Sequence, residues 1–465
     1  MKYIPFFSLF FAYACLLTLA YAHPGHGGKV QYDQYGHVVR NDSLEMTRAQ
    51  RGIYKKTVAA VLDFLEQFHP HGESYNTFIN KMRNDLIFSY DHPYRTRGFC
   101  NAFALCRDDY VGMKLKDMNK VQQAKFLELM QTLLAPYGNQ KMKTVFERQS
   151  VIFDTEQAYR NNPEKFPAVG GPKGTSLENW KPVDAKGKPV PRDADDYYIA
   201  FFGDIGQFVN GNLSPNKGFG IRVEGHHLSL NFTFVNKNGH LAVSTAPSFY
   251  GSNPMVVPPA PVSSPDQYKN WKLKVGDTFM LSETQIAKLF IQSLNPEEQK
   301  IARYSHMASP MFESAANQKP TESHNYLEGN TEGLQIFDLH GTQKEIEQKK
   351  YLLIEFMKLI VATQREVFLN LKDINADINN MRISFYGSLD KFGEFYFRIQ
   401  SKNFLLELVQ SSNFSIINPG NINNKNDPLN NGLYNNNHVH IMFRDLRNDW
   451  GYDPLYLHEK QDHDK

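Results

Sequence analysis

Two periods of hydrophobic residues divide this chain into helical and strand-like stretches. Between Asp42 and Phe68 the apolar residues recur every three or four positions, which predicts an amphipathic helix that Asp42 or Ser43 can cap. The same period predicts further helices over 114–160, with a break near 136–138, and over 282–290 and 296–306.

Elsewhere apolar and polar residues alternate, which is typical of strands that bury one face. We predict strands over 220–234, 241–245, 394–409 and 438–444, with a hairpin turn at Asn238-Gly239. Three stretches rich in proline, glycine or asparagine are expected to be loops, namely 161–196, 247–270 and 411–437. The pattern as a whole indicates an α+β fold of helical segments and antiparallel sheets.

The order of helix followed by strand occurs twice along the chain. Gly112–Met118 matches Gly333–Leu339 in spacing, and Arg222–Leu230 matches Arg398–Leu406. We therefore predict an internally duplicated, pseudo-symmetric unit with a composite site between its halves. Its halves are expected to form one body, with boundaries at 42–270 and 271–465.

The N-terminus has the pattern of a secretion signal. Lys2 precedes an apolar run from Ile4 to Leu19, and the small-x-small sequence Ala20-Tyr21-Ala22 follows. We predict that 1–22 is a signal peptide and that the protein is exported, to the periplasm or outside the cell. The alternative is a retained membrane anchor. The following segment, 23–41, is rich in histidine and glycine and is expected to be flexible.

Composition excludes some classes of partner and supports others. With 465 residues, 41% hydrophobic and 13% aromatic, the chain can bury a large core. A net charge of +2 without a basic block gives no reason to expect nucleic acid, or a membrane surface after signal removal. Cys100 and Cys106 remain in the exported chain and predict one disulfide, the alternative being two buried thiols.

The clearest chemical signal is the stretch Asn437–Asp445. In an extended strand His438 and His440 point to the same face, while Val439 and Ile441 point to the other. The Cβ atoms of the two histidines would lie about 6.5–7 Å apart. At that spacing both imidazoles can bind one metal ion if a third ligand comes from another segment.

We predict that His227 is the third ligand, because alternation places it on the polar face of its strand with Ser229 and Asn231. His226 is an alternate ligand. His23 is a second alternate, since cleavage after Ala22 would expose its amine and ring together.

Three imidazoles with an open fourth position suit catalytic zinc, and copper or iron would accept the same set. Glu224 and Glu407 are candidates for the general base, a fourth ligand or an orienting partner. The alternative is that the histidines are hydrogen-bonded polar residues within a sheet. No organic or nucleotide cofactor is implied, because the sequence has no Walker loop and no glycine-rich turn that opens a helix after a strand.

Two further groups of polar residues occur near these positions. Arg444 and Asp445 are a candidate catalytic pair for an anionic group, or a structural salt bridge at a strand end. Tyr396, Arg398 and Gln400 share one strand face and are candidate substrate-binding residues, although cross-strand packing explains them equally well.

Four blocks of the sequence are recognisable together: Glu224–Thr233, Pro247–Pro254, Tyr396–Gln400, and His438 to Gly451 with Arg444-Asp445 and Asn448-Asp449. They resemble the family catalogued as domain of unknown function 3500, from about residue 50 to 460. That family has no established activity, so the resemblance implies kinship and leaves the function to be argued from residues.

Two functions fit these observations. The first is an exported metal-dependent hydrolase with a histidine-rich site between two sheet halves. The second is a secreted protein that binds a small-molecule or cell-surface ligand and has structural histidines. A copper oxidase built on His23 is a third idea.

Overall fold

The computed structural model describes residues 31–32, 38–39, 48–96, 110–161, 197–210, 213, 218–237, 240–257, 273–304, 333–365, 375, 378–401, 404–411, 438–445 and 449–451. The chain divides into a unit of residues 1–43 and a unit of residues 44–465. In the first unit β1 (Gln31–Tyr32) pairs antiparallel with β2 (Val38–Val39). This hairpin lies within 23–41, where the sequence predicts a flexible segment. The predicted signal peptide, the cysteine pair and His23 lie outside the described residues.

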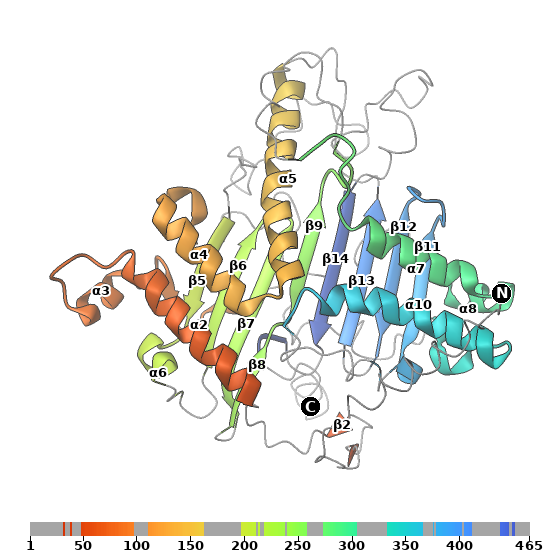
Figure 1. Cartoon of the computed structure of the whole chain (residues 1–465), viewed down its shortest axis with the longest axis horizontal. Coiled ribbons are helices and arrows are strands. Elements are labelled where there is room, and N and C mark those ends of the chain that lie inside the picture. The colour runs from red at the N-terminus through yellow and green to blue at the C-terminus, as the bar shows by residue number, and fades with distance from the viewer. Residues whose placement is uncertain are drawn as a thin grey trace, which may run out of the picture. The chain divides into compact units, whose positions relative to one another are not determined.

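Within the described part of the second unit, twelve strands form one sheet (Figure 1). They are β3 (Ile87–Phe88), β4 (Met113–Lys114), β5 (Tyr197–Phe202), β6 (Gly218–Gly225), β7 (Leu228–Lys237), β8 (His240–Ser244), β9 (Ser248–Ser252), β10 (Leu334–Gln335), β11 (Arg382–Gly387), β12 (Phe395–Gln400), β13 (Phe404–Ser411) and β14 (His438–Asp445). The order across the sheet is β10-β11-β12-β13-β14-β9-β7-β6-β5-β3, with β4 beside β5 and β8 beside β7. Among these strands only β3 and β5 pair in parallel.

The helices confirm the predicted α+β class. They are α2 (Arg48–Glu66), α3 (Tyr75–Lys81), α4 (Lys120–Leu133), α5 (Pro136–Asn161), α6 (Ile205–Val209), α7 (Leu281–Ser293), α8 (Pro296–Ala302) and α10 (Gln343–Val361). Short 3-10 turns are η1 (Pro93–Arg95), η3 (Leu115–Asp117), η5 (Ile336–Asp338), η6 (Ile378–Asn380) and η8 (Asp449–Gly451). As predicted, the helical pattern over 114–160 is broken at Pro136, where α5 begins.

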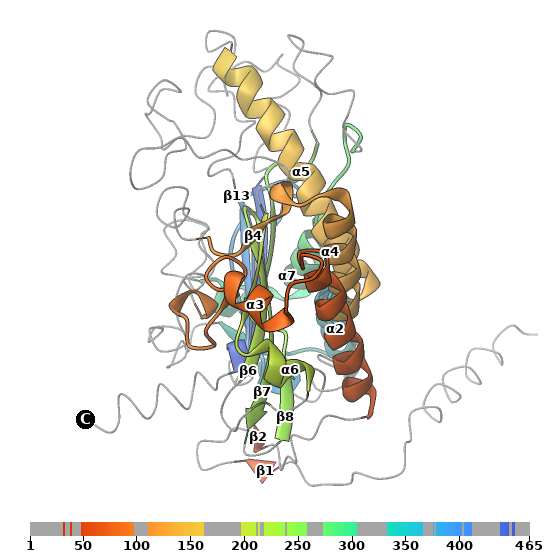
Figure 2. The same ribbon diagram turned by 90° about the vertical axis from the view of Figure 1, so that its left-hand side faces the viewer.

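The helices cover one face of the sheet. Figure 2 shows α2, α4 and α7 on the same side of the strands, and α10 packs beside α7. In the core between these layers, the ring of Phe64 in α2 lies 6.0 Å from Phe201 in β5. The ring of Phe356 in α10 lies 5.3 Å from Phe397 in β12. Burial of these aromatic side chains drives the sheet and the helices together. Among the described helices, none is long and apolar enough to span a membrane.

Two predicted strands are in fact hairpins. The prediction over 220–234 covers β6 and β7, with the turn at His226-His227, and the prediction over 394–409 covers β12 and β13. The sequence does contain a signal for these turns, because the apolar residues change from odd to even positions across each turn. Ile221 and Val223 are odd positions, whereas Leu228 and Leu230 are even. A two-residue turn produces this shift while leaving the alternation intact on both sides.

The prediction of a loop over 247–270 is wrong at its start. Ser248–Ser252 is β9, which pairs with β7 on one side and with β14 on the other. The prolines that suggested a loop, Pro247 and Pro254, lie just outside the strand and remove no hydrogen bond from its ladders. All five residues of β9 are buried. The strand that joins the two halves of the sheet was therefore missed.

The halves of the sheet repeat an order of elements. In one, Gly112 precedes β4, η3 and α4, and β4 pairs with β5. In the other, Gly333 precedes β10, η5 and α10, and β10 pairs with β11. The two glycines have φ angles of 107° and 111°, which disfavour other residues. The antiparallel pairing of β9 with β14 joins the two halves. Internal duplication stays a prediction.

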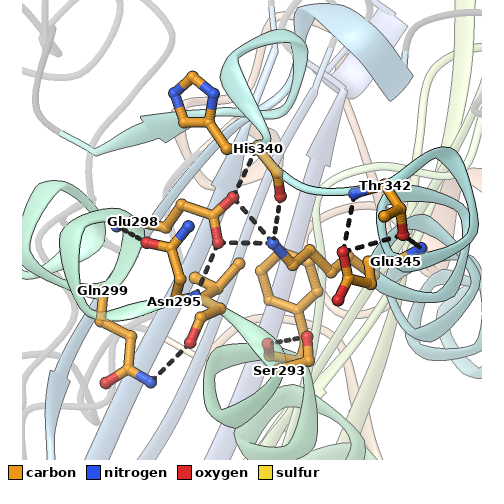
Figure 3. Close-up of polar contacts among 10 residues, drawn as sticks. Ser293, Asn295, Glu298, Gln299, His340, Thr342 and Glu345 are labelled. Carbon is orange, nitrogen blue, oxygen red and sulfur yellow. Dashed lines mark hydrogen bonds and ion pairs between the residues drawn. The ribbon is translucent and has the colours of Figure 1, made fainter.

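A buried ion pair connects α8 to α10 (Figure 3). Lys349 Nζ lies 2.6 Å from Glu298 Oε2, and the other carboxylate oxygen accepts a hydrogen bond from the His340 backbone N–H at 2.7 Å. Glu298 also completes a capping box with Asn295 at the start of α8. Burial alone would raise the pKa of Glu298, but hydrogen bonds from Lys349 and two backbone N–H groups bring it below its ordinary value. The buried charges of this cluster are paired and hydrogen-bonded, so we interpret its role as structural.

Candidate metal centre

The face of the sheet away from the helices carries polar side chains that are nearly all buried. Cross-strand register places one row of residues on this face: Glu224, Ser229, Phe249, Met442, Glu407, Arg398 and Ser384. The neighbouring row contains Gly251, His440, Val409, Tyr396 and Tyr386. Residues that are far apart in the sequence, including most of the predicted site residues, therefore share one surface of the sheet.

Three histidines meet at the junction of the two halves. His438 and His440 lie on β14, and His227 lies in the turn between β6 and β7. His227 Nε2 is 2.8 Å from His438 Nε2, and one ligand nitrogen from each of the three rings lies within 4.8 Å of the others. Their exposed fractions are 1%, 4% and 6% for His227, His438 and His440. Among the described residues no carboxylate belongs to this group.

Strand order explains why these positions converge. β9 pairs with both β7 and β14, so the tip of the β6-β7 hairpin comes beside the start of β14. The Gly251 N–H donates to the His227 carbonyl at 2.8 Å, which ties the turn to β9. His227 has a φ of 65°, in the left-handed region. Such backbone strain in a residue other than glycine is concentrated at functional sites.

Gly251 makes room for the cluster, and sequence reasoning missed it. A Cβ at this position would lie 2.6 Å from His440 Cδ2 and 2.7 Å from His227 Cδ2. Any larger residue would therefore displace both rings. The available signal was a glycine between the bulky residues Phe249-Tyr250 and the next turn, because glycine inside a strand marks a close approach of other atoms.

The environment keeps at least one imidazole neutral. Burial, and secondarily the charge of His438, lowers the pKa of His440 well below its ordinary value. A neutral imidazole has a lone pair to offer, which is the protonation state that metal binding requires. At neutral pH the His440 ring therefore has a lone pair that it can offer to a cation.

His226, the alternate ligand, lies beside the cluster and has another partner. Its ring centroid is 3.8 Å from that of His227, and its Nδ1 is 2.7 Å from Gln149 Oε1 in α5. The strand geometry expected for these two histidines does not apply, because both lie in the turn. His226 is only half-buried and is not part of the group whose ligand nitrogens converge.

The two candidate bases differ in how their oxygens are used. Both oxygens of Glu224 accept from Arg222, at 2.8 Å from Nε and 2.7 Å from Nη2. Glu407 is fully buried, and its Oε1 accepts from the Tyr396 hydroxyl at 2.6 Å. Glu407 lies opposite Met442 and is thus a diagonal neighbour of His440, a relation in which residues are about 7–8 Å apart. Of the two carboxylates, Glu407 is the better placed.

The Arg444 side chain bonds to a residue that the sequence reasoning did not select. Its Nε lies 2.6 Å from Asp449 Oδ2, and the Asp445 backbone N–H donates to Asp449 Oδ1 at 3.0 Å. Burial raises the pKa of Asp449 to about 6, although Arg444 favours its charged form. These contacts close the turn that follows β14 and agree with the structural alternative for Arg444. A catalytic role for Asp445 stays a prediction.

Tyr396, Arg398 and Gln400 lie on β12 and face the same side of the sheet as the histidines. Tyr396 bonds to Glu407, and Arg398 Nη2 donates to Gln400 Oε1. The three residues predicted to bind substrate are therefore together on the polar face, two strands from β14.

Fold and site together define an α+β protein with a buried cluster of three histidines where the halves of one sheet join. Residues 71–452 match the family described as "Protein of unknown function (DUF3500)", and the chain belongs to this family. The resemblance seen in the sequence is thereby confirmed. Neither a curated protein nor a solved structure matches the chain.

Proposed function

We propose that this protein is an exported metal-dependent hydrolase whose ion is bound by His227, His438 and His440. The observation that supports this most strongly is the convergence of three buried imidazoles with ligand nitrogens within 4.8 Å of one another. In a tetrahedral zinc site, bond lengths of about 2.0–2.1 Å place two nitrogens about 3.3 Å apart. From separations of at most 4.8 Å, the nitrogens would have to move closer by up to about 1.5 Å to reach that geometry.

Zinc is the ion that this set suits best, with copper or iron as alternatives. Three neutral ligands would leave the charge of the ion uncompensated, so a bound water would have a pKa of about 7 and could attack an ester, amide or phosphate ester. Glu407 is the proposed general base, because Arg222 already occupies both oxygens of Glu224. The leader peptide predicted at 1–22 would export the chain, and its cleavage is part of the proposal.

Elemental analysis tests the proposal. The mature protein, purified without a histidine tag, should contain about one equivalent of zinc, copper or iron. His438→Ala should lose the metal, and His340→Ala, which changes an exposed histidine outside the cluster, should retain it. A screen with ester, amide and phosphate-ester substrates follows on the loaded protein. Glu407→Gln should keep the metal and lose about 10²- to 10⁴-fold in kcat.

One observation supports a second function, a secreted ligand-binding protein with structural histidines. The 2.8 Å contact between His227 Nε2 and His438 Nε2 is a good hydrogen bond without any ion. If wild-type protein contains no metal and takes none up from zinc, copper or iron salts, the binding function is preferred. The copper oxidase ranks third, because it requires His23 to join His438 and His440.

A further inference from the structure

Arg398 lies on the polar face with a guanidinium that is buried and only partly bonded. Its side chain is 2% exposed, and Nη2 donates to Gln400 Oε1. Nε and Nη1 make no hydrogen bond within the part of the chain that the structure describes. These two nitrogens carry three N–H donors. A buried cation with unused donors is costly unless a ligand completes it.

The other half of the sheet shows the same arrangement with its partner built in. Arg222 on β6 corresponds to Arg398 on β12, and each is followed two residues later by the residue that it bonds. For Arg222 that residue is Glu224, whose two oxygens lie 2.8 and 2.7 Å from Nε and Nη2. For Arg398 it is the neutral Gln400. The chain thus supplies a carboxylate at this position to one arginine and an amide to the other.

Among the described residues, no carboxylate on this part of the face forms an ion pair with Arg398. Glu407 lies opposite Arg398 in register, but Glu407 Oε1 accepts a hydrogen bond from the Tyr396 hydroxyl. Arg398 forms no ion pair with a described residue. Arg382 lies opposite Gln400 on β11 and adds a second positive charge, with Nη1 donating to the Gly333 carbonyl at 2.8 Å. The surface around Gln400 therefore favours an anion.

We propose that Arg398, together with Gln400, binds the carboxylate of a small-molecule ligand. A carboxylate is planar and offers two oxygens at the spacing of a guanidinium edge, which is the arrangement that Glu224 makes with Arg222 in this chain. The ligand would lie on the same face as the histidine cluster. The proposal does not depend on a metal, because none of its contacts involves the histidines.

Isothermal titration with sodium acetate and sodium benzoate, at constant ionic strength, tests this site on the mature full-length chain. Titrations run both before and after chelation, so that loss of metal and loss of anion binding are separate results. Wild-type protein should bind both carboxylates in either state. Arg398→Gln should weaken binding by about tenfold or more. Arg303→Gln, which removes an exposed positive charge, should leave it unchanged.

Gln400→Glu is the decisive second variant. It recreates the Arg222–Glu224 pair within the second half, so it should abolish carboxylate binding while the melting temperature stays equal or rises. Carboxylate binding that survives in this variant, or in a folded Arg398→Gln, would overturn the proposal. So would a wild-type chain that binds inorganic phosphate but neither carboxylate.

Discussion

Two buried polar clusters in this protein differ in the chemical groups that they bring together. Around Glu298, the carboxylate oxygens face the Lys349 ammonium and two backbone N–H groups, so opposite charges and donors are matched (Figure 3). Around His440, three chemically identical rings face one another, and the close contact between His227 and His438 joins two groups of the same kind. The first cluster pairs opposite charges, whereas the second gathers rings of one kind.

This difference separates a structural joint from a candidate binding site. A buried ion pair is strongly destabilised when one partner is removed, because the remaining charge loses its compensation. Removing one imidazole breaks a hydrogen bond rather than an ion pair among the described residues, so it should cost the fold less. The variants below test the contrast from the largest expected effect to the smallest.

Lys349→Met should destabilise the protein by about 3–5 kcal/mol, because it leaves Glu298 buried without its cation. Urea unfolding monitored by circular dichroism measures the loss. Lys344→Met, at an exposed position in the first turn of α10, is the matched control and should change the free energy of unfolding by less than about 0.5 kcal/mol. Equal effects of the two variants would mean that the buried pair has no special role.

The free energy of unfolding of His438→Ala should lie within about 1 kcal/mol of that of the metal-free wild type, since the contact with His227 is a single hydrogen bond between two imidazoles. Zinc at a hundred times its Kd should stabilise wild-type protein by about 2.7 kcal/mol and should not stabilise the variant. Thermal unfolding with and without zinc measures both quantities. A zinc response in His438→Ala similar to that of wild type would remove this histidine from the site.

Gly251→Ala should cost about 1–3 kcal/mol and weaken zinc binding, because the added methyl group meets the rings of His227 and His440. Gly52→Ala in α2 is the control. Apart from its chain neighbours and the backbone of its own helix, no atom lies within 4 Å of the added Cβ, so the substitution should stabilise the protein by about 0.5–1 kcal/mol. Unchanged zinc affinity in Gly251→Ala would show that the rings can move without losing the site.

The pH dependence of stability should report the Glu298–Lys349 pair. The pKa of Glu298 is lower in the folded protein than in the unfolded chain, so the unfolded chain binds the proton first as the pH falls. The stability that the ionised carboxylate contributes is therefore fully present above about pH 4.5, and it is lost as the pH falls further. Melting temperatures between about pH 7 and 3 should fall less steeply for Glu298→Gln than for wild type.

The sequence allowed the type of most elements and the face of β14 to be predicted. His438 and His440 lie side by side because alternation in a strand is a local property. The hairpins and β9 were missed for a different reason. A two-residue turn preserves alternation within each strand, so only the change from odd apolar positions such as Ile221 to even ones such as Leu228 distinguished a hairpin from a single strand. The strand β9 was missed because the prolines just outside it resemble those of a loop.

The partners of the charged residues could not be predicted, because they depend on register across the sheet. The ion pair of Arg444 is with Asp449 in the following turn, and Arg222 occupies Glu224 within its own strand. His227 was selected by its face on a strand, yet it lies in a turn and reaches His438 because β9 stands between β7 and β14. Gly251 became visible only once the rings were placed.

The most direct test of the metal centre is anomalous diffraction from a crystal of the mature protein loaded with zinc, recorded at the zinc absorption edge. The account predicts one strong peak about 2.0–2.1 Å from a ring nitrogen of each of His227, His438 and His440. A peak bound by other residues, or no peak between these rings in fully loaded protein, would contradict it.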